Sequence, residues 1–308
     1  ARPSSWLSGP PGSPRRSRAS ATASPAALLE MERPDDRQRL LQANRLARLL
    51  TTSDLAVAPE LRALAGRTLS LLGDPRPGVG LDSDGLPDIA WCSIESDAGF
   101  MISKYPVTVA QFQAFVADGG YSEARRDCWS EEGWDWKAAS NGPYTLHDSY
   151  GFLNHPMVMV TYYEAAAFCQ WLSARRVERI ALPTQIQWEM AATNAGSRCF
   201  PWGNEEPSDD HANWSETEIS CTTAVGIFPK SMTANGVADM AGNIWEWCDG
   251  DGEGPAGSGS DPYIASEKSR RVLGGSYMDS ADALRFGHRL MSAPSYRDLD
   301  CGFRVIKS

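Results

Sequence analysis

Cysteine is the residue type in this 308-residue sequence with the widest range of possible chemistry, because thiolates bind soft metals and act as nucleophiles. None of the cysteines forms a Cys-x-x-Cys pair, so the common zinc and thioredoxin-like patterns are excluded. Their odd number and wide spacing predict free, mostly buried thiols in a reducing compartment, and hence a cytoplasmic location. The seven are Cys92, Cys128, Cys169, Cys199, Cys221, Cys248 and Cys301.

Histidine offers a second route to metal binding or to base catalysis. The four histidines, at 147, 155, 211 and 288, show no His-x-x-x-His spacing, and no nucleophile-elbow motif accompanies them. His155 precedes a proline, which favours a structural core histidine over a catalyst. No Gly-x-x-x-x-Gly-Lys phosphate loop occurs in the sequence, and the one Gly-x-Gly-x-x-Gly match, at residues 252–257, does not lie between a predicted strand and a predicted helix.

Composition restricts the class of protein further. A hydrophobic fraction of 42% and a charged fraction of 22% are typical of a packed chain. The net charge of −10 argues against binding to nucleic-acid phosphates, and no apolar run is long enough for membrane insertion. Residues 1–34 are rich in Ser, Pro and Arg, so we expect a disordered tail or linker there.

The elements that must position any site fall into two regions. Residues 35–87 contain two leucine-rich periodic runs, which predict a helical hairpin that packs on the main domain. The alternative is a docking arm for a partner, a second subunit or an upstream signalling domain, acting through residues 1–87. The main domain, 88–308, combines helices and strands without βαβ alternation, and this indicates an α+β fold. Helices are expected at 108–117, 162–174 and 185–193, and strands at 89–94, 99–105, 225–228, 272–273 and 302–306.

Seven sequence blocks in this order resemble the formylglycine-generating enzyme, or sulfatase-modifying factor, family over roughly residues 90–306. The resemblance implies a loop-rich C-type-lectin-like fold. The blocks include Gly99-Phe100-Met101-Ile102-Ser103-Lys104-Tyr105-Pro106-Val107-Thr108, Asn154-His155-Pro156-Met157-Val158, Phe200-Pro201-Trp202-Gly203-Asn204, Ala241-Gly242-Asn243-Ile244-Trp245-Glu246-Trp247, Gly274-Gly275-Ser276-Tyr277 and Gly302-Phe303-Arg304. Near the end of the last block, Arg304 is expected to pair with a carboxylate inside the domain.

The same resemblance bears on catalysis. Enzymes of the family oxidise a peptidyl cysteine with copper held by two cysteines that follow the Gly-Gly-Ser-Tyr block. The matching positions here are Asp279 and Leu284, and neither offers the soft thiolate that selects Cu(I). We therefore expect no copper and no catalytic residues. A related branch that holds iron through clustered histidines on an added helical domain is not expected either, because the histidines here are scattered.

Structural calcium is a further implication of the resemblance. By match, Asp239 and Glu246 would supply carboxylates, and Gly242 and Ile244 backbone carbonyls, since Ca²⁺ prefers hard oxygen ligands. A second site would use Asn213 and the carbonyl of Trp214. The alternative is that the two carboxylates only accept hydrogen bonds from the surrounding loops.

The final segment, residues 272–304, also resembles the variable region of proteins diversified by retroelements, which use the same lectin-like scaffold. In that comparison Arg285, Arg289, Pro294 and Arg297 belong to the fixed frame. The mixed side chains between them are typical of a binding surface for a protein ligand. The candidate ligand-binding residues are Tyr277, Asp279, Ala283, His288, Leu290, Met291, Ser292, Ala293, Tyr296, Asp298, Leu299 and Asp300.

Two functions from different classes follow. The first is a non-enzymatic protein that binds an unidentified protein ligand through a surface on a lectin-like scaffold, a surface that the resemblance to retroelement-diversified proteins implies is diversified. The second is a relative of the oxidase whose copper-dependent chemistry is altered or lost. The replaced thiol positions favour the first hypothesis.

Overall fold

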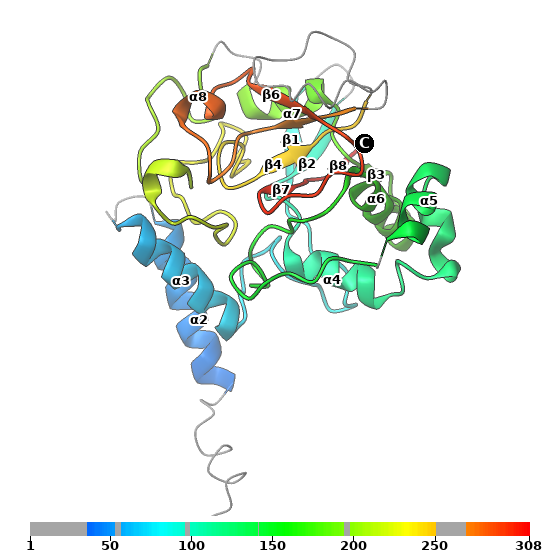
Figure 1. The fold of residues 1–308 in the computed structure, drawn as a ribbon. Helices are drawn as coiled ribbons and strands as arrows, with labels where there is room; N and C mark the ends of the chain where they lie inside the picture. Colours follow the sequence, from blue (N-terminus) through cyan, green and yellow to red (C-terminus); the bar gives the residue numbers. More distant parts are fainter. Residues whose placement is uncertain (1–35, 53–56, 96–98, 141, 194–197, 251–268) are drawn as a thin grey trace, which may run out of the picture. The chain divides into compact units, whose positions relative to one another are not determined.

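The computed structural model describes residues 36–52, 57–95, 99–140, 142–193, 198–250 and 269–308 (Figure 1). The chain divides into residues 1–38 and 39–308, and the second unit contains almost all of the described residues. The tail expected at 1–34 lies outside the described residues. No helix in the described part is both long and apolar enough to cross a bilayer.

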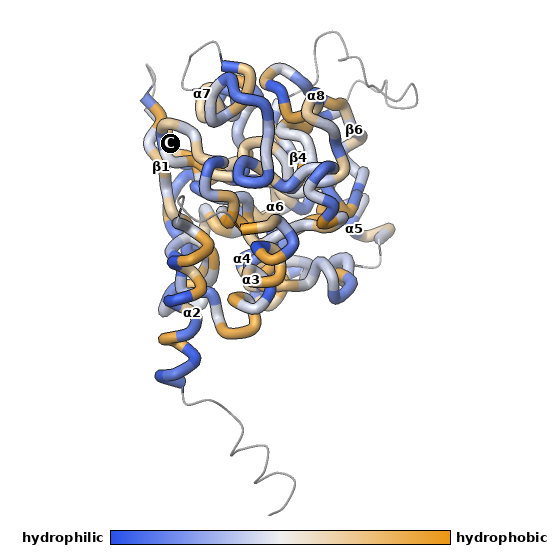
Figure 2. The backbone as a smooth tube through the Cα atoms, turned by 90° about the vertical axis from the view of Figure 1, so that its left-hand side faces the viewer, coloured by the Kyte–Doolittle hydropathy of each residue, from blue (hydrophilic) through white to orange (hydrophobic). Residues whose placement is uncertain are grey.

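The helical hairpin consists of α2 (Asp36–Thr51) and α3 (Pro59–Leu72). Proline at its first position suits the start of α3, and Gly73, with φ of +88°, follows its last residue. Figure 2 shows hydrophilic and hydrophobic residues alternating along α2, as expected for an amphipathic helix. Apolar residues of both helices pack against the main domain in one cluster that includes Ala43, Ala47, Leu50, Leu69, Ala224, Ile227 and Phe228.

Two small four-stranded sheets form the centre of the main domain. The first has the order β1 (Trp91–Ile94), β2 (Phe100–Ser103), β8 (Ile306–Lys307) and β3 (Ile180–Ala181), with antiparallel pairs throughout. The second has the order β6 (Arg289–Ser292), β5 (Arg270–Leu273), β4 (Trp245–Trp247) and β7 (Cys301–Gly302). Only the β4–β7 pair of these ladders is parallel.

Helices around the sheets begin at side-chain caps that the local sequence supplies. Thr108 and Thr161 each form a capping box, with Gln111 and Glu164 respectively, at the starts of α4 and α6. Phe112 of α4 and Phe168 of α6 stack with a ring separation of 5.9 Å. The elements are α4 (Val109–Ala117), the 3-10 turn η1 (Glu123–Cys128), α5 (Glu131–Ala139), α6 (Tyr162–Arg176), α7 (Gln185–Thr193), the 3-10 turn η2 (Ser215–Thr217) and α8 (Ala281–Leu284).

Two predicted strands are wrong. Residues 225–228 form a buried turn, in which Gly226 has φ of +65° and a Cβ would lie 2.2 Å from the Tyr105 ring. The strand expected at 302–306 is instead divided between β7 in the second sheet and β8 in the first. Arg304 lies between these two strands in the sequence, and its side chain extends into the space between the sheets.

Arg304 is fully buried and forms a bidentate ion pair with Glu246 of β4, as the sequence predicts. Its Nε and Nη2 lie 2.6 and 2.7 Å from the two carboxylate oxygens, and Trp188 Nε1 donates a further hydrogen bond to Glu246 at 2.7 Å. The remaining guanidinium N–H groups donate to the carbonyl oxygens of Ser103, Lys104, Ala238 and Asp239. One side chain therefore connects both sheets and the loop before β4.

We expect Arg304→Met to lower the free energy of unfolding by about 3–5 kcal/mol, because it leaves the Glu246 carboxylate buried and unpaired. Lys307→Met is the matched control: Lys307 pairs with the exposed Glu178 at 3.2 Å, so its loss should cost about 1 kcal/mol or less. Urea denaturation at pH 7 measures both. Equal effects of the two variants would contradict the central role of the buried pair.

Candidate ligand-binding site

The Gly274-Gly275 turn positions the start of the final segment. Both glycines have positive φ, +107° and +71°, and a Cβ on Gly275 would lie 3.0 Å from the Ala283 carbonyl oxygen. The turn brings Ser276 against Asp279, whose Oδ2 accepts hydrogen bonds from Ser276 N at 2.9 Å and Ser276 Oγ at 2.7 Å. The Asp279 carboxylate thus closes the turn at the position where the family resemblance places a copper-binding thiol.

Tyr277, the next residue, points inward. It is 3% exposed, and its hydroxyl lies 2.9 Å from that of Tyr150. Burial, followed by the hydrogen bond with Tyr150, raises the pKa of Tyr277 well above its usual value, so the phenol is protonated at neutral pH. The paired hydroxyls connect the final segment to the loop that contains Tyr150.

Three carboxylates lie close together beside this turn. Burial, together with charge repulsion from Asp298 and Asp279, raises the pKa of Asp300 to about 6, against a hydrogen bond from Ser276 that lowers it. Within the described ranges, none of the three carboxylates lies within 4 Å of a lysine or arginine nitrogen. We call Asp279, Asp298 and Asp300 the acidic cluster. Its negative charge has no cationic partner in the described part of the chain.

Three of the twelve candidate ligand-binding residues are not available at the surface. Tyr277, Ala283 and Ser292 are buried, at 3%, 9% and 7% exposure respectively. Ala283 belongs to the main core cluster, and Ser292 is the last residue of β6, where it pairs with Arg270 of β5. Their burial corrects the prediction that these three side chains face a ligand. Neither residue type nor spacing in the sequence reveals which neighbouring segments cover a side chain.

The other nine candidates are half-buried or exposed, and β6 with the loop after it contains most of them. β6 is the edge strand of the second sheet, and Tyr296 in the following loop is 43% exposed and donates a hydrogen bond to Asp298. His288 contacts the Trp245 ring, with centroids 5.8 Å apart. We call these nine residues the final-segment surface: Asp279, His288, Leu290, Met291, Ala293, Tyr296, Asp298, Leu299 and Asp300.

Neither of the two positions matched to the copper-binding thiols carries a cysteine. Leu284, at the second matched position, is 2% exposed and packs in an apolar cluster with Phe200 and Trp214. Cys301 and Cys248 are fully buried, and burial raises the pKa of each thiol well above its usual value. These thiols are therefore protonated at neutral pH and ill-suited to bind Cu(I).

The candidate calcium ligands make other contacts. Both oxygens of Glu246 accept from the Arg304 guanidinium, while Asp239 Oδ2 accepts from Gly226 N at 2.6 Å. A cation between these carboxylates would face the guanidinium, so the residues as arranged do not fit the first site. At the second, the side chain of Asn213 and the carbonyl of Trp214 both accept from Thr217 Oγ1. The contacts favour the hydrogen-bonding alternative, and calcium binding stays a prediction.

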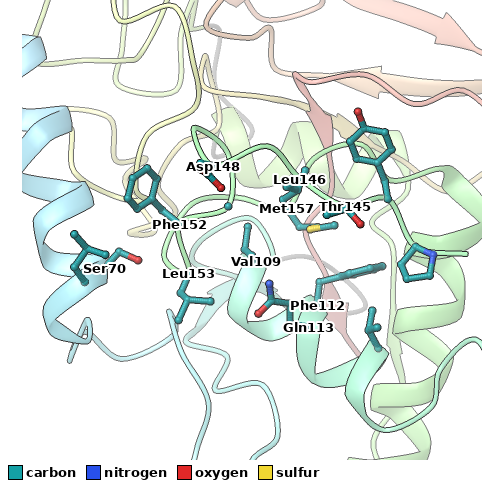
Figure 3. Close-up of a pocket in the computed structure, with 15 residues that line it drawn as sticks. Ser70, Val109, Phe112, Gln113, Thr145, Leu146, Asp148, Phe152, Leu153 and Met157 are labelled. Carbon is teal, nitrogen blue, oxygen red and sulfur yellow. The ribbon is translucent and has the colours of Figure 1, made fainter. Parts of the chain in front are cut away.

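The sequence analysis did not identify two hollows outside the final segment. One, of about 730 Å³, lies among the end of α3, α4 and the loop of residues 143–153, and its lining is mainly apolar. Figure 3 shows Val109, Phe112 and Gln113 projecting from α4 near Phe152 and Leu153. The other, of about 430 Å³, contains Arg67 and Cys221. Each is built from segments far apart in the sequence, so no local signal could have revealed them.

Comparison with known proteins places this fold among the C-type-lectin-like folds. Treponema denticola variable protein 1 superposes with a TM-score of 0.51 at 22% identity, over 71% of this chain and 91% of that one. PvdO from Pseudomonas aeruginosa gives a TM-score of 0.52 at 22% identity, over 76% and 99%. At this level of identity the likeness shows the fold alone.

Residues 89–308 match the sulfatase-modifying factor enzyme 1-like domain, and the chain belongs to this family. Hercynine oxygenase of Mycobacterium tuberculosis is 30% identical over 67% of this chain and 50% of its own length. The formylglycine-generating enzyme of Thermomonospora curvata is 30% identical over 48% and 59%. The sequence analysis did not predict this similarity to an oxygenase, because the histidines of this chain are scattered. The chain spans about half the length of the hercynine oxygenase from M. tuberculosis, so the activity of that whole enzyme is not assigned to this chain.

Asp300 gives a pH-dependent test of the site. Its pKa of about 6 exceeds the value of about 3.9 in an unfolded chain, so the folded state holds the proton more tightly. The free energy of unfolding therefore falls as pH rises from about 4 to 6, and the protein loses stability over this range. We expect this loss of stability to be smaller by about 1–3 kcal/mol in Asp300→Asn, as measured by urea denaturation at pH 4 and pH 7.

Asp282→Asn provides the matched control, because it removes an equal charge from an exposed position of the final segment. Asp239, whose pKa burial also raises to about 6, remains in both variants and cancels in the comparison. An unchanged pH dependence in Asp300→Asn would show that this carboxyl ionises normally.

Proposed function

We propose that this chain is a ligand-binding member of its family, in which the final-segment surface recognises a protein without bond chemistry. The observation that carries the proposal is the pair of positions that the family resemblance assigns to copper. Asp279 closes a turn and Leu284 is buried in an apolar cluster, so neither can hold a soft metal through sulfur.

The backbone of this segment is held independently of its outward-facing side chains. Met159 N donates to the Asp298 carbonyl at 2.9 Å, Tyr162 N to the Pro294 carbonyl at 3.1 Å, and Trp245 N to the Asp300 carbonyl at 2.7 Å. β6 is held by its four-residue register with β5. Side chains on such a frame can change without loss of the fold, which is what a binding surface requires.

The chemistry of the surface favours a ligand with basic groups next to apolar ones. The acidic cluster supplies negative charge, and Leu290, Met291 and Leu299 supply half-buried apolar area. Aromatic and apolar residues at the centre of an interface, with charges that orient the partner, are typical of protein recognition. We therefore favour a protein ligand that presents lysine or arginine, over nucleic acid or a membrane.

Diversification of residues 272–304 is part of the proposal and rests on the sequence resemblance. It requires a reverse transcriptase gene and a near-copy of this segment close to the gene, with adenines where the two copies differ. Genomic sequence on either side is the direct observation, and the absence of both elements would leave a binder with one fixed ligand.

The second candidate is an oxygenase or oxidase with altered chemistry. What supports it is the similarity to hercynine oxygenases over two thirds of this chain. Because the match covers only half of that relative, such an activity would depend on groups outside the shared region. A signalling domain or partner that acts through residues 1–87 would fit either candidate.

An assay of peptide oxidation tests the copper-dependent oxidase form of the second candidate. We expect the Cu(I)-loaded protein to leave a cysteine-containing peptide unoxidised in the presence of oxygen, because the matched positions offer no thiolate pair. The Thermomonospora enzyme, tested with the same peptide, serves as the positive control. Mass spectrometry of the peptide is the readout, and conversion of its cysteine to an aldehyde would refute the non-enzymatic proposal.

The binding surface is tested by Met291→Ala, Tyr296→Ala and Leu299→Ala combined in one variant. We expect near-native thermal stability, and loss of binding to any ligand that a display screen selects on the wild-type protein. The matched control combines Leu40→Ala, Leu41→Ala and Leu49→Ala on the exposed face of α2, and it should bind normally. Unfolding of the first variant would instead assign these residues to the core.

A further inference from the structure

The smaller of the two hollows contains an arginine that has no carboxylate partner among the residues that the structure describes. It measures about 430 Å³ and is bounded by Arg67 of α3, the loop of residues 148–152 and residues 219–221. A volume of this order is in the range of small-molecule sites. It shares no residue with the final-segment surface, although the hydroxyls of Tyr150 and Tyr277 connect the two regions.

Arg67 has an unusual set of contacts. Its Nη2 lies 3.1 Å from Cys221 Sγ, and its guanidinium lies 6.0 Å from the centroid of the Phe152 ring. Its Nε is buried without a hydrogen-bond partner, and no carboxylate oxygen in the described residues lies within 4 Å of its nitrogens. Asp148, which also borders the hollow, is exposed to solvent. A half-buried guanidinium without a carboxylate partner can accept an anion from solution.

The charge of Arg67 affects the pKa of a buried histidine nearby. His155 is fully buried, and its Nδ1 lies 3.0 Å from Thr222 Oγ1, while its ring packs 5.1 Å from that of Phe152. Burial, and secondarily the charge of Arg67, lowers the pKa of His155 to about 3, so the imidazole is neutral. It therefore adds no second cation, and Arg67 is left as the group that would attract an anion here.

We propose that this hollow binds a small molecule bearing a carboxylate, with Arg67 as the group that holds the carboxylate and the Cys221 thiol beside it. Only Nη2 contacts the sulfur, and Nη1, which makes no hydrogen bond within the described residues, can donate to an incoming oxygen. The apolar Phe152 ring and Ile219 would contact the rest of the molecule. Such a site is independent of the protein ligand proposed for the final segment.

Alkylation of Cys221 tests the proposal in the full chain. Iodoacetate and iodoacetamide react by the same step, in which the thiolate forms a carbon–sulfur bond and iodide leaves, but only iodoacetate carries a carboxylate. Site-resolved mass spectrometry gives the ratio of the two rates at each cysteine. We expect this ratio at Cys221 to exceed that at the exposed Cys199 by about fivefold or more, and millimolar acetate to slow both reactions at Cys221 relative to equal chloride.

Arg67→Met should reduce the ratio at Cys221 to that at Cys199, whereas Arg45→Met, on the exposed face of α2, should leave it unchanged. The wild-type comparison needs no variant to fold and decides the question alone. Equal ratios at Cys221 and Cys199, or a ratio that Arg67→Met leaves unchanged, would overturn the proposal. Variants of the final-segment surface do not affect this readout, so the two proposals can fail separately.

Discussion

The buried ion pair between Arg304 and Glu246 is the interaction on which the rest of the domain depends. The chain has little regular secondary structure, and its two sheets contain strands of only two to four residues. Short strands contribute few ladder hydrogen bonds, so loops must be fixed by side chains that reach across the core. Arg304 does this with one guanidinium, which satisfies a carboxylate and four carbonyl groups from three separate segments. Because it divides β7 from β8, it also determines where the final segment enters each sheet.

This arrangement separates residues that hold the final segment from residues that face outward. The backbone of the 293–300 loop is fixed by hydrogen bonds to its carbonyl oxygens, while Tyr296 and Leu299 keep access to solvent. At the start of the segment, Asp279 stabilises a turn, in a place where the family resemblance puts a metal-binding thiol. A scaffold of the sulfatase-modifying factor family is thus compatible with recognition that involves no metal–thiolate chemistry.

Uncompensated charge of opposite sign lies in two neighbouring regions of the fold. The acidic cluster has no cationic partner in the described residues, and Arg67 has no anionic one. The Tyr150–Tyr277 hydroxyl pair lies between the two regions, and both rings are part of the packed structure. Half-buried charges without partners in the protein are available to ligands of the opposite charge. The opposite signs fit the two separate ligands proposed above.

The sequence by itself determined the features that depend on residues close together in the chain. Apolar patterning predicted the helices that begin near Thr108 and Thr161, and the ordered motifs predicted the family, the Arg304 ion pair and the replaced thiols. The tertiary structure alone decided which residues are covered. Tyr277, Ala283 and Ser292 have surface-like spacing but are buried, and Arg67 meets Cys221 across 154 positions. The physical reason is that capping and turn geometry act over a few residues, whereas burial and charge pairing depend on elements that packing brings from distant parts of the chain.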